Sequence, residues 1–327
     1  MKTLELSRRA LNVCSVAAVL AGCSGNPAYP NAPLSADLTG RRLDAPLPLK
    51  AAPTFLAADV FGVYGYPDPN KVNQPPTCTL PLYGAVGAAS DSQGNYIVPA
   101  YAKTRSHRVV YVYEAGTCGT LLASLEIKGL AFAAASSDVH TRIVVGVERK
   151  LGRQSAGAIV VCSLTHCGAP ITSSNVTGGG EGVAVAKNGD CWMSGLTHGR
   201  NGSPVLAYWP SCTGAGEAAT GFQNTSSAGL FVDTRGNLGA FDTNNDSLYV
   251  YSGCNPACRL VSKTRLEGQS FFGNLNAKGD ELVAGDSSFV QCDVYSYRPT
   301  GSRFRYSFNN GLEGRYLTFC ISAASGD

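Results

Sequence analysis

Short apolar segments separated by small polar turns run through the chain from Thr54 onward, and they set the first expectation about its fold. Large and β-branched side chains predominate in these segments, as in Val109–Tyr113, Arg142–Val147 and Ser247–Tyr251. Gly, Asn, Asp and Ser bound them, which is typical of β-strands joined by tight turns. No stretch has the periodicity of an amphipathic helix. The pattern therefore predicts an all-β protein.

One turn sequence recurs along the chain. Each copy has a glycine followed by Asn or Asp, which suits the positive-φ positions of a hairpin turn. The glycines are Gly94, Gly189, Gly236 and Gly279, and the intervals between them are 95, 47 and 43 residues. The long interval is two periods, and a weaker turn at 136–141 fills it. One more period beyond Gly279 leads to a sixth turn at 322–327.

Six turns at a period of 43–50 residues accommodate four short strands per unit, which is the pattern of a β-propeller blade. We therefore predict a six-bladed β-propeller over residues 54–327, with an irregular all-β sandwich as the alternative. Blade three illustrates the assignment, and its expected strands are 182–186, 191–194, 205–209 and a strand near 218–222.

The ends of the chain are predicted to complete blade six together. Its first strand, Tyr316–Ile321, comes from the C-terminal end, and Thr54–Asp59 and Val60–Tyr66 supply the second and third strands. Antiparallel pairing of Tyr316–Ile321 with Thr54–Asp59 would leave no open sheet edge. The alternative is a truncated chain with an incomplete blade six.

Two copies of the repeat carry a family resemblance. Gly180–Asp190 and Ala228–Asn237 resemble NHL repeats, which form degenerate six-bladed propellers. The similarity covers most of residues 54–327 but is confined to the inner hairpin of each blade. It implies an architecture and not an activity, because propellers carry many unrelated functions.

The N-terminal segment has the pattern of an export signal. Lys2, Arg8 and Arg9 precede a short apolar stretch that ends in Leu20-Ala21-Gly22-Cys23. This stretch is too short to span a bilayer, and its small residues before the cleavage point are typical of a signal peptide. The ending resembles the lipobox of bacterial lipoproteins. The resemblance implies cleavage after residue 22 and lipidation of Cys23.

Residues 23–53 are rich in Pro and Ala without periodicity, which predicts a disordered tether between the lipid anchor and the propeller. The predicted organisation is thus a signal peptide at 1–22, a tether at 23–53 and a propeller at 54–327. Ser24 follows the lipidated cysteine, whereas Asp there is the usual inner-membrane retention signal in enteric bacteria. The resemblance therefore implies a cell-envelope location, on the outer membrane where the organism has one.

The charge balance bears on partners. The chain has 26 Lys and Arg against 23 Asp and Glu. Removal of residues 1–22 takes away three basic residues and one acidic one, which leaves 23 against 22. A charge near +1 provides no field to hold a phosphate backbone, so nucleic acid is not an expected partner. We expect a monomer that contacts the membrane through its lipid.

Ten cysteines remain besides Cys14 and Cys23, and an even number in an exported chain predicts disulfides and not a zinc site. Close spacing predicts two local bonds, Cys162 with Cys167 and Cys254 with Cys258. The sequence leaves the pairing of the other six open: Cys78, Cys118, Cys191, Cys212, Cys292 and Cys320.

Candidate chemistry lies where second strands end. Alignment of the blades on their turns puts Asp59, Asp242 and Asp286 in one ring at a mouth of the central channel, and Glu181 on the same face. Such carboxylates could bind a divalent cation such as calcium. The setting of Glu181 resembles the metal-ligand glutamate of gluconolactonase-type propellers, although that family's further Asn and Asp motifs are missing. The alternative is that these carboxylates cap backbone N–H groups of turns.

The expected function depends on which catalytic motifs the sequence contains. No catalytic motif such as a nucleophile elbow, a phosphate loop or a zinc-binding helix occurs in the sequence. We therefore expect a binding or scaffold lipoprotein without a cofactor, whose partner is an envelope protein, a glycan or a small molecule. The alternative is a metal-dependent hydrolase or lyase of the gluconolactonase-like type.

Overall fold

The computed structural model divides the chain into two units, Met1–Ala45 and Pro46–Asp327, and every described residue belongs to the second. The described residues are 55–58, 63–66, 76–80, 82, 85, 87–91, 93–101, 108–114, 117, 119–137, 142–151, 154–176, 178–197, 202–276, 278–289, 291–308 and 319–322. The predicted signal peptide, Cys23 and the tether lie outside them, so these assignments and their boundaries stay predictions. Within the described ranges, no helix has the length and apolar character that crossing a membrane requires.

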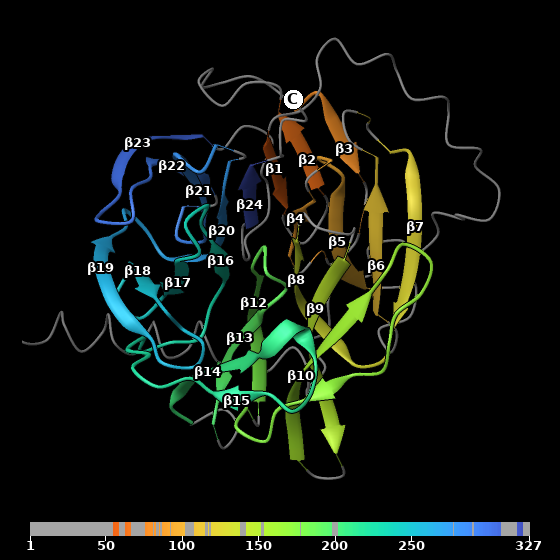
Figure 1. The fold of residues 1–327 in the computed structure, drawn as a ribbon. Helices are drawn as coiled ribbons and strands as arrows, with labels where there is room; N and C mark the ends of the chain where they lie inside the picture. The colour runs from red at the N-terminus through yellow and green to blue at the C-terminus, as the bar shows by residue number, and fades with distance from the viewer. Residues whose placement is uncertain are drawn as a thin grey trace, which may run out of the picture. The chain divides into compact units, whose positions relative to one another are not determined.

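The second unit is the expected six-bladed β-propeller, built of six antiparallel four-stranded sheets (Figure 1). Five blades are continuous in sequence, and each runs from its inner to its outer strand. Blade one is β4 (Ala89–Ser90), β5 (Tyr96–Tyr101), β6 (Arg108–Tyr113) and β7 (Leu121–Ile127), and blade two is β8 (Leu130–Ser137), β9 (Arg142–Leu151), β10 (Gln154–Cys162) and β11 (Ile171–Thr172).

The next three blades have the same order. Blade three is β12 (Gly178–Val185), β13 (Cys191–Leu196), β14 (Pro204–Trp209) and β15 (Glu217–Ala218), with a 3-10 turn at Pro210–Cys212. Blade four is β16 (Leu230–Val232), β17 (Leu238–Asp242), β18 (Ser247–Ser252) and β19 (Arg259–Arg265), and blade five is β20 (Ser270–Leu275), β21 (Glu281–Asp286), β22 (Gln291–Ser296) and β23 (Arg303–Phe308). The four strands predicted for blade three all form, and its fourth is the shortest.

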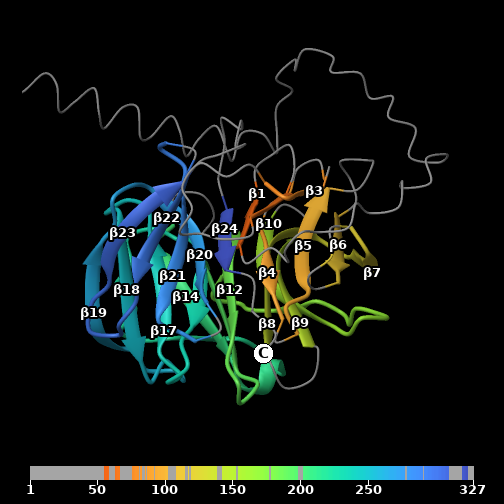
Figure 2. The same ribbon diagram turned by 90° about the horizontal axis from the view of Figure 1, so that it is seen from above.

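Blade six confirms the predicted joining of the two chain ends. Its order is β24 (Phe319–Ser322), β1 (Phe55–Ala58), β2 (Val63–Tyr66) and β3 (Cys78–Leu80). β24 pairs antiparallel with β1, and the two lie side by side in both ribbon views (Figures 1 and 2). A disulfide between Cys292 of β22 and Cys320 of β24 ties this closing strand to blade five.

The hydrophobic core consists of six clusters, one between each pair of neighbouring blades. Side chains alternate between the two faces of a strand, so a middle strand contributes to two clusters. In β17, for example, Leu238 and Ala240 pack toward blade three, whereas Phe241 packs toward blade five. Both faces of the middle strands are therefore buried, which explains their nearly continuous apolar sequence.

The repeated turns take the predicted form. Gly94, Gly189, Gly236 and Gly279 have φ between 69° and 92°, a region that a side chain disfavours. In blades one, four and five, the side chain of the first residue of the turn also holds it closed. In blade four, Asp233 Oδ1 accepts hydrogen bonds from the backbone N–H groups of Arg235 and Asn237 at 2.9 and 2.8 Å. Turn chemistry therefore fixes the inner hairpins of blades one, three, four and five locally.

Four disulfides join described cysteines. Both local loops that the spacing predicts are closed, by Cys162–Cys167 and by Cys254–Cys258. The remaining two, Cys191–Cys212 and Cys292–Cys320, join residues that the sequence left unpaired. Cys118 and the side chain of Cys78 lie outside the described residues.

Candidate functional site

The predicted ring of second-strand ends is described at two of its acidic positions. Asp242 ends β17 and Asp286 ends β21, and both side chains have 0 % exposure. Asp59 lies outside the described residues. Glu181 lies in β12, but its side chain is outside them as well. The predicted set of four carboxylates therefore stays a prediction, and the geometry below concerns Asp242 and Asp286.

The carboxylate of Asp242 accepts hydrogen bonds from two loops of blade four. Its carboxylate accepts from the backbone N–H of Thr225 at 2.6 Å and from the hydroxyl of Ser226 at 3.0 Å. It also accepts from the backbone N–H of Asn244 at 3.1 Å, within the turn that follows β17. These donors surround the negatively charged carboxylate, and their hydrogen bonds hold the two loops together.

Asp286 occupies the corresponding position in blade five. It accepts from the backbone N–H of Ser288 at 2.8 Å and from the side-chain amide of Gln291 at 3.3 Å. Burial raises its pKa, and the hydrogen bonds from Ser288 counteract that rise. The carboxylate packs directly on Gly268, where a Cβ atom would overlap it. Asp286 therefore occupies a space that only glycine leaves open.

A third buried carboxylate, Asp293 of β22, was not predicted. It has 0 % exposure and accepts from the hydroxyl of Ser307 at 2.7 Å and from Gln291 at 3.0 Å. Burial raises its pKa to about 6, and Ser307 counteracts the rise. The side-chain amide of Gln291 thus bridges Asp293 and Asp286. An acidic residue between the apolar residues Cys292 and Val294 was the signal for this position.

The surroundings of these carboxylates bear on cation binding. Each accepts from backbone N–H, hydroxyl or amide groups, and such donors compete for the oxygen lone pairs that a cation would need. Within the described part of the chain, no three His, Cys, Asp or Glu side chains are grouped so as to hold a metal ion. In this arrangement, the carboxylates of Asp242 and Asp286 serve as hydrogen-bond acceptors for the loops of their own blades.

The opposite ends of the blades carry the inner turns, and two grooves lie there between neighbouring blades. The blade 3/4 groove has a volume of about 290 Å³, and its lining includes Lys187, Asn188, Asp190 and Cys254. The blade 4/5 groove has about 410 Å³, and its lining includes Arg235, Lys278, Asp280, Arg298 and Thr300. Both are formed by two successive turns and the loop after a third strand.

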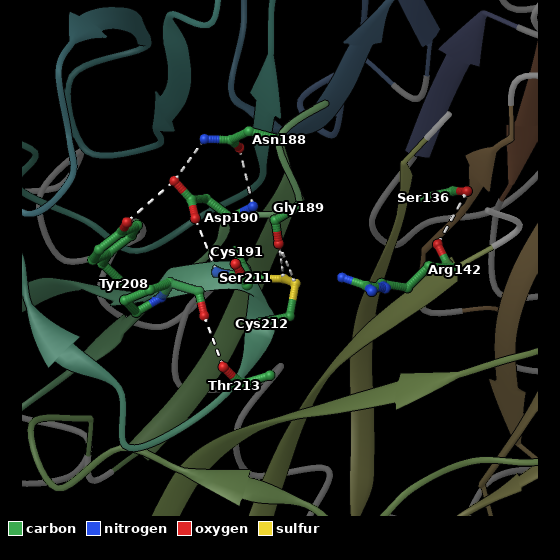
Figure 3. The surroundings of a disulfide bond; sticks show 11 residues. Ser136, Arg142, Asn188, Gly189, Asp190, Cys191, Tyr208, Ser211, Cys212 and Thr213 are labelled. Carbon is green, nitrogen blue, oxygen red and sulfur yellow. Dashed lines mark hydrogen bonds between the residues drawn. A yellow bond between two sulfur atoms is a disulfide. The ribbon is translucent and has the colours of Figure 1, made fainter. Parts of the chain in front are cut away.

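Asp190 lines the blade 3/4 groove and fixes its wall through hydrogen bonds (Figure 3). Asp190 accepts from the backbone N–H of Ser211 at 2.9 Å and from the hydroxyl of Tyr208 at 3.1 Å. The Cys191–Cys212 disulfide lies beside these contacts and links the start of β13 to the 3-10 turn after β14. The first turn of the groove is therefore tied to the rest of blade three.

The blade 4/5 groove is lined by a different chemistry, which the sequence analysis missed. Arg235 and Lys278 each precede the turn glycine of their blade, and Arg298 lies in the loop after β22. All three are exposed. Basic residues before the glycine of consecutive repeats were the available signal. Arg298 could not be assigned to this groove before the fold was known.

Comparisons with known proteins support the fold but do not identify a function. No family model matches the chain, and no curated protein matches it. Solved structures do: one in the nidogen/laminin complex has a TM-score of 0.64 and 12% identity, covering 83% of this chain and 99% of that one.

Two further similar structures are lactonases by name. The periplasmic gluconolactonase of Pseudomonas aeruginosa has a TM-score of 0.53 and 10% identity, covering 84% of this chain and 100% of that one. A protein from Bacteroides fragilis described as a 6-phosphogluconolactonase has 0.52 and 8%, covering 84% and 99%. At such identities the similarity shows the six-bladed propeller fold alone.

Proposed function

We propose that the chain is a binding or scaffold module held at the cell envelope by a lipid on Cys23. The chemistry of Asp242 and Asp286 carries the proposal. Their carboxylates are buried and accept hydrogen bonds from the loops of their own blades, so they serve to close those loops. The grooves at the other end of the blades, in contrast, have exposed polar side chains. An envelope protein, a glycan or a small molecule is the partner.

Capture from envelope material tests this function. The full chain, immobilised, is incubated with solubilised envelope proteins and with envelope glycans, and a chain denatured beforehand is the control. We expect the folded chain to retain a specific component. Metal-dependent turnover of a lactone by the same preparation would contradict the proposal.

The alternative is a metal-dependent hydrolase or lyase that uses Glu181, Asp242 and Asp286. The observation that favours it is that Asp242 and Asp286 end equivalent strands of consecutive blades, in a fold that gluconolactonases also have. A cation there would polarise a carbonyl or activate water. Elemental analysis of the purified chain should then find calcium, zinc or manganese, and added metal should raise its melting temperature. If neither occurs, the alternative is wrong.

Membrane attachment has its own test. With lipid on Cys23, the chain should sediment with the outer-membrane fraction of a host that has two membranes. Cys23→Ala should release it into the soluble fraction, whereas Cys14→Ala, which replaces the other cysteine of the signal region, should not. A Cys23→Ala chain that still fractionates with membranes would contradict the anchor.

A further inference from the structure

The blade 4/5 groove brings together three cations from separate parts of the chain. The side chain of Thr234 packs so closely on Gly279 that a Cβ atom there would lie 2.8 Å from the methyl carbon of Thr234. The turns of blades four and five are therefore in contact. Arg235 follows Thr234 and Lys278 precedes Gly279, so contact between the turns brings the two basic residues to one groove. Arg298 lines the same groove from the loop after β22.

The acidic groups of this groove, Asp233 and Asp280, accept hydrogen bonds from neutral donors. Both oxygens of Asp233 are occupied: besides the two backbone bonds of its turn, the carboxylate accepts from the side-chain amide of Asn237 at 2.9 Å and from the hydroxyl of Tyr297 at 3.1 Å. Asp280 accepts from the side-chain amide of Asn276 at 2.7 Å. These donors are neutral, and among the described residues neither carboxylate forms an ion pair with a basic residue of the groove.

The three cations are also without an ion pair in the part of the chain that the structure describes. The ion pair found there is Arg305 with Glu281, at 2.6 Å. The charge of Arg235 reaches the groove wall: burial raises the pKa of the Tyr297 hydroxyl, Asp233 adds to the rise, and Arg235 counteracts it. The lining thus has three cations against two carboxylates, Asp233 and Asp280, which leaves one positive charge in excess, and a bound anion would offset that excess.

We propose that the blade 4/5 groove binds an oxyanion, the carboxylate or phosphate group of a small polyhydroxylated ligand. Arg235, Lys278 and Arg298 supply charged donors for the oxyanion. The hydroxyls of Thr234 and Thr300 and the carboxylate of Asp280 supply donors and acceptors for ligand hydroxyls. A volume of about 410 Å³ falls within the range of small-molecule pockets. The inference rests on the proposed binding function and names its ligand class.

The blade 3/4 groove provides a matched control within the same chain. It is built from the same kind of turn, but its lining has one cation, Lys187, together with Asp190. Where blade five has Arg298, the equivalent position of blade four is Cys254, which is held in the Cys254–Cys258 disulfide. An oxyanion should therefore distinguish the two grooves.

Calorimetric titration of the purified full chain tests the inference. The probes are glucose 6-phosphate for the phosphate source, glucuronate for the carboxylate source, and glucose as the uncharged reference. We expect at least one charged probe to bind with a millimolar or lower dissociation constant that weakens as salt is added. Arg298→Gln or Lys278→Gln should weaken this binding about tenfold, the effect of about 1.4 kcal/mol from a lost charged hydrogen bond. Lys187→Gln should leave it unchanged.

The outcomes separate this inference from the proposed function. Equal binding of glucose, no binding of either charged probe, or binding lost in Lys187→Gln but retained in Arg298→Gln would overturn the oxyanion site. If the chain nevertheless retains an envelope component, the binding function stands without it. Conversely, chemical conversion of a bound probe would contradict the non-enzymatic function while supporting the site. The side chains of Arg298, Lys278 and Lys187 are exposed, so their replacement should not disturb folding. Unchanged urea-unfolding curves for the three variants would exclude misfolding.

Discussion

Blades four and five share a frame of equivalent strands and loop contacts, but some of their buried side chains differ. In both, a tyrosine of the third strand closes the loop that enters the blade. Tyr251 accepts from the backbone N–H of Gln223 at 3.0 Å, and Tyr295 accepts from that of Glu267 at 3.0 Å. The spacing is 28 residues in each case. The shared frame thus includes long-range contacts besides the turn.

The difference begins two residues before those tyrosines. Tyr249 and Asp293 occupy the same register, opposite Ala240 and Ala284. Tyr249 stacks on Tyr251 with ring centroids 6.2 Å apart, and the Lys263 ammonium lies 4.8 Å from its ring centroid. Asp293 instead accepts hydrogen bonds from neutral groups. Strand pairing thus sets the position of a side chain but not its chemistry, so neighbouring blades can acquire different properties.

The largest expected effect concerns the loop-closing carboxylates. Asp242→Ala would leave the backbone N–H of Thr225, that of Asn244 and the hydroxyl of Ser226 without their acceptor. We expect a loss of about 3 kcal/mol in the free energy of unfolding. Asp286→Ala removes fewer bonds and should cost about 1–2 kcal/mol. Urea unfolding at neutral pH measures both, and an equal or smaller loss for Asp242→Ala would contradict the difference between the blades.

The next effect is a pH dependence of the free energy of unfolding. At this register blade five has Asp293 and blade four has Tyr249, so we expect the dependence to come from blade five. Burial raises the pKa of Asp293 to about 6 in the folded chain, above the ordinary value of about 3.9. The folded state therefore holds the proton more tightly, and this contribution to stability is full below about pH 4 and lost as pH rises through about 6.

The measurement is the free energy of unfolding between pH 4 and pH 7. Across this range, wild type should lose roughly 2–3 kcal/mol more than Asp293→Asn. Tyr249→Phe, the matched change in blade four, should leave the wild-type slope unaltered. Parallel curves for wild type and Asp293→Asn would show that Asp293 does not titrate in this range.

A smaller effect is expected from the loop that lines the blade 3/4 groove. Cys254 and Cys258 close a loop with a sequence separation of 4. The double change to serine should cost about 2 kcal/mol, because a short disulfide loop restricts the unfolded chain only modestly. Arg298→Gln, at the matching place in blade five, should cost almost nothing. Thermal unfolding with and without reductant compares them, and equal losses would contradict the assignment.

The smallest effect concerns the wall of the blade 4/5 groove. Tyr297→Phe removes the hydroxyl that donates to Asp233 and should cost about 1 kcal/mol. Its ring stays packed against Phe231, so the core between the blades is retained. Urea unfolding measures the change. A loss of several kcal/mol would mean that the ring itself had moved.

The propeller could be predicted from the sequence alone, because its signals were local and repeated. In the four repeats a glycine followed by Asn or Asp forms a positive-φ turn, and the apolar runs between these turns form strands. The period of these turns gave the number of blades. The expectation that the chain ends meet rested on the same count, and the pairing of β24 with β1 confirms it.

Which side chains meet between blades could be known only from the folded chain. The bond between Cys292 and Cys320 depends on the radial placement of β22 and β24. The burial of Asp242 and Asp286 depends on register, since a shift of one residue moves a side chain to the other face of its strand. Arg235, Lys278 and Arg298 share a groove because neighbouring blades pack together. A turn forms through interactions among adjacent residues, whereas contacts between blades form through residues far apart in the chain, which leave no spacing pattern to read.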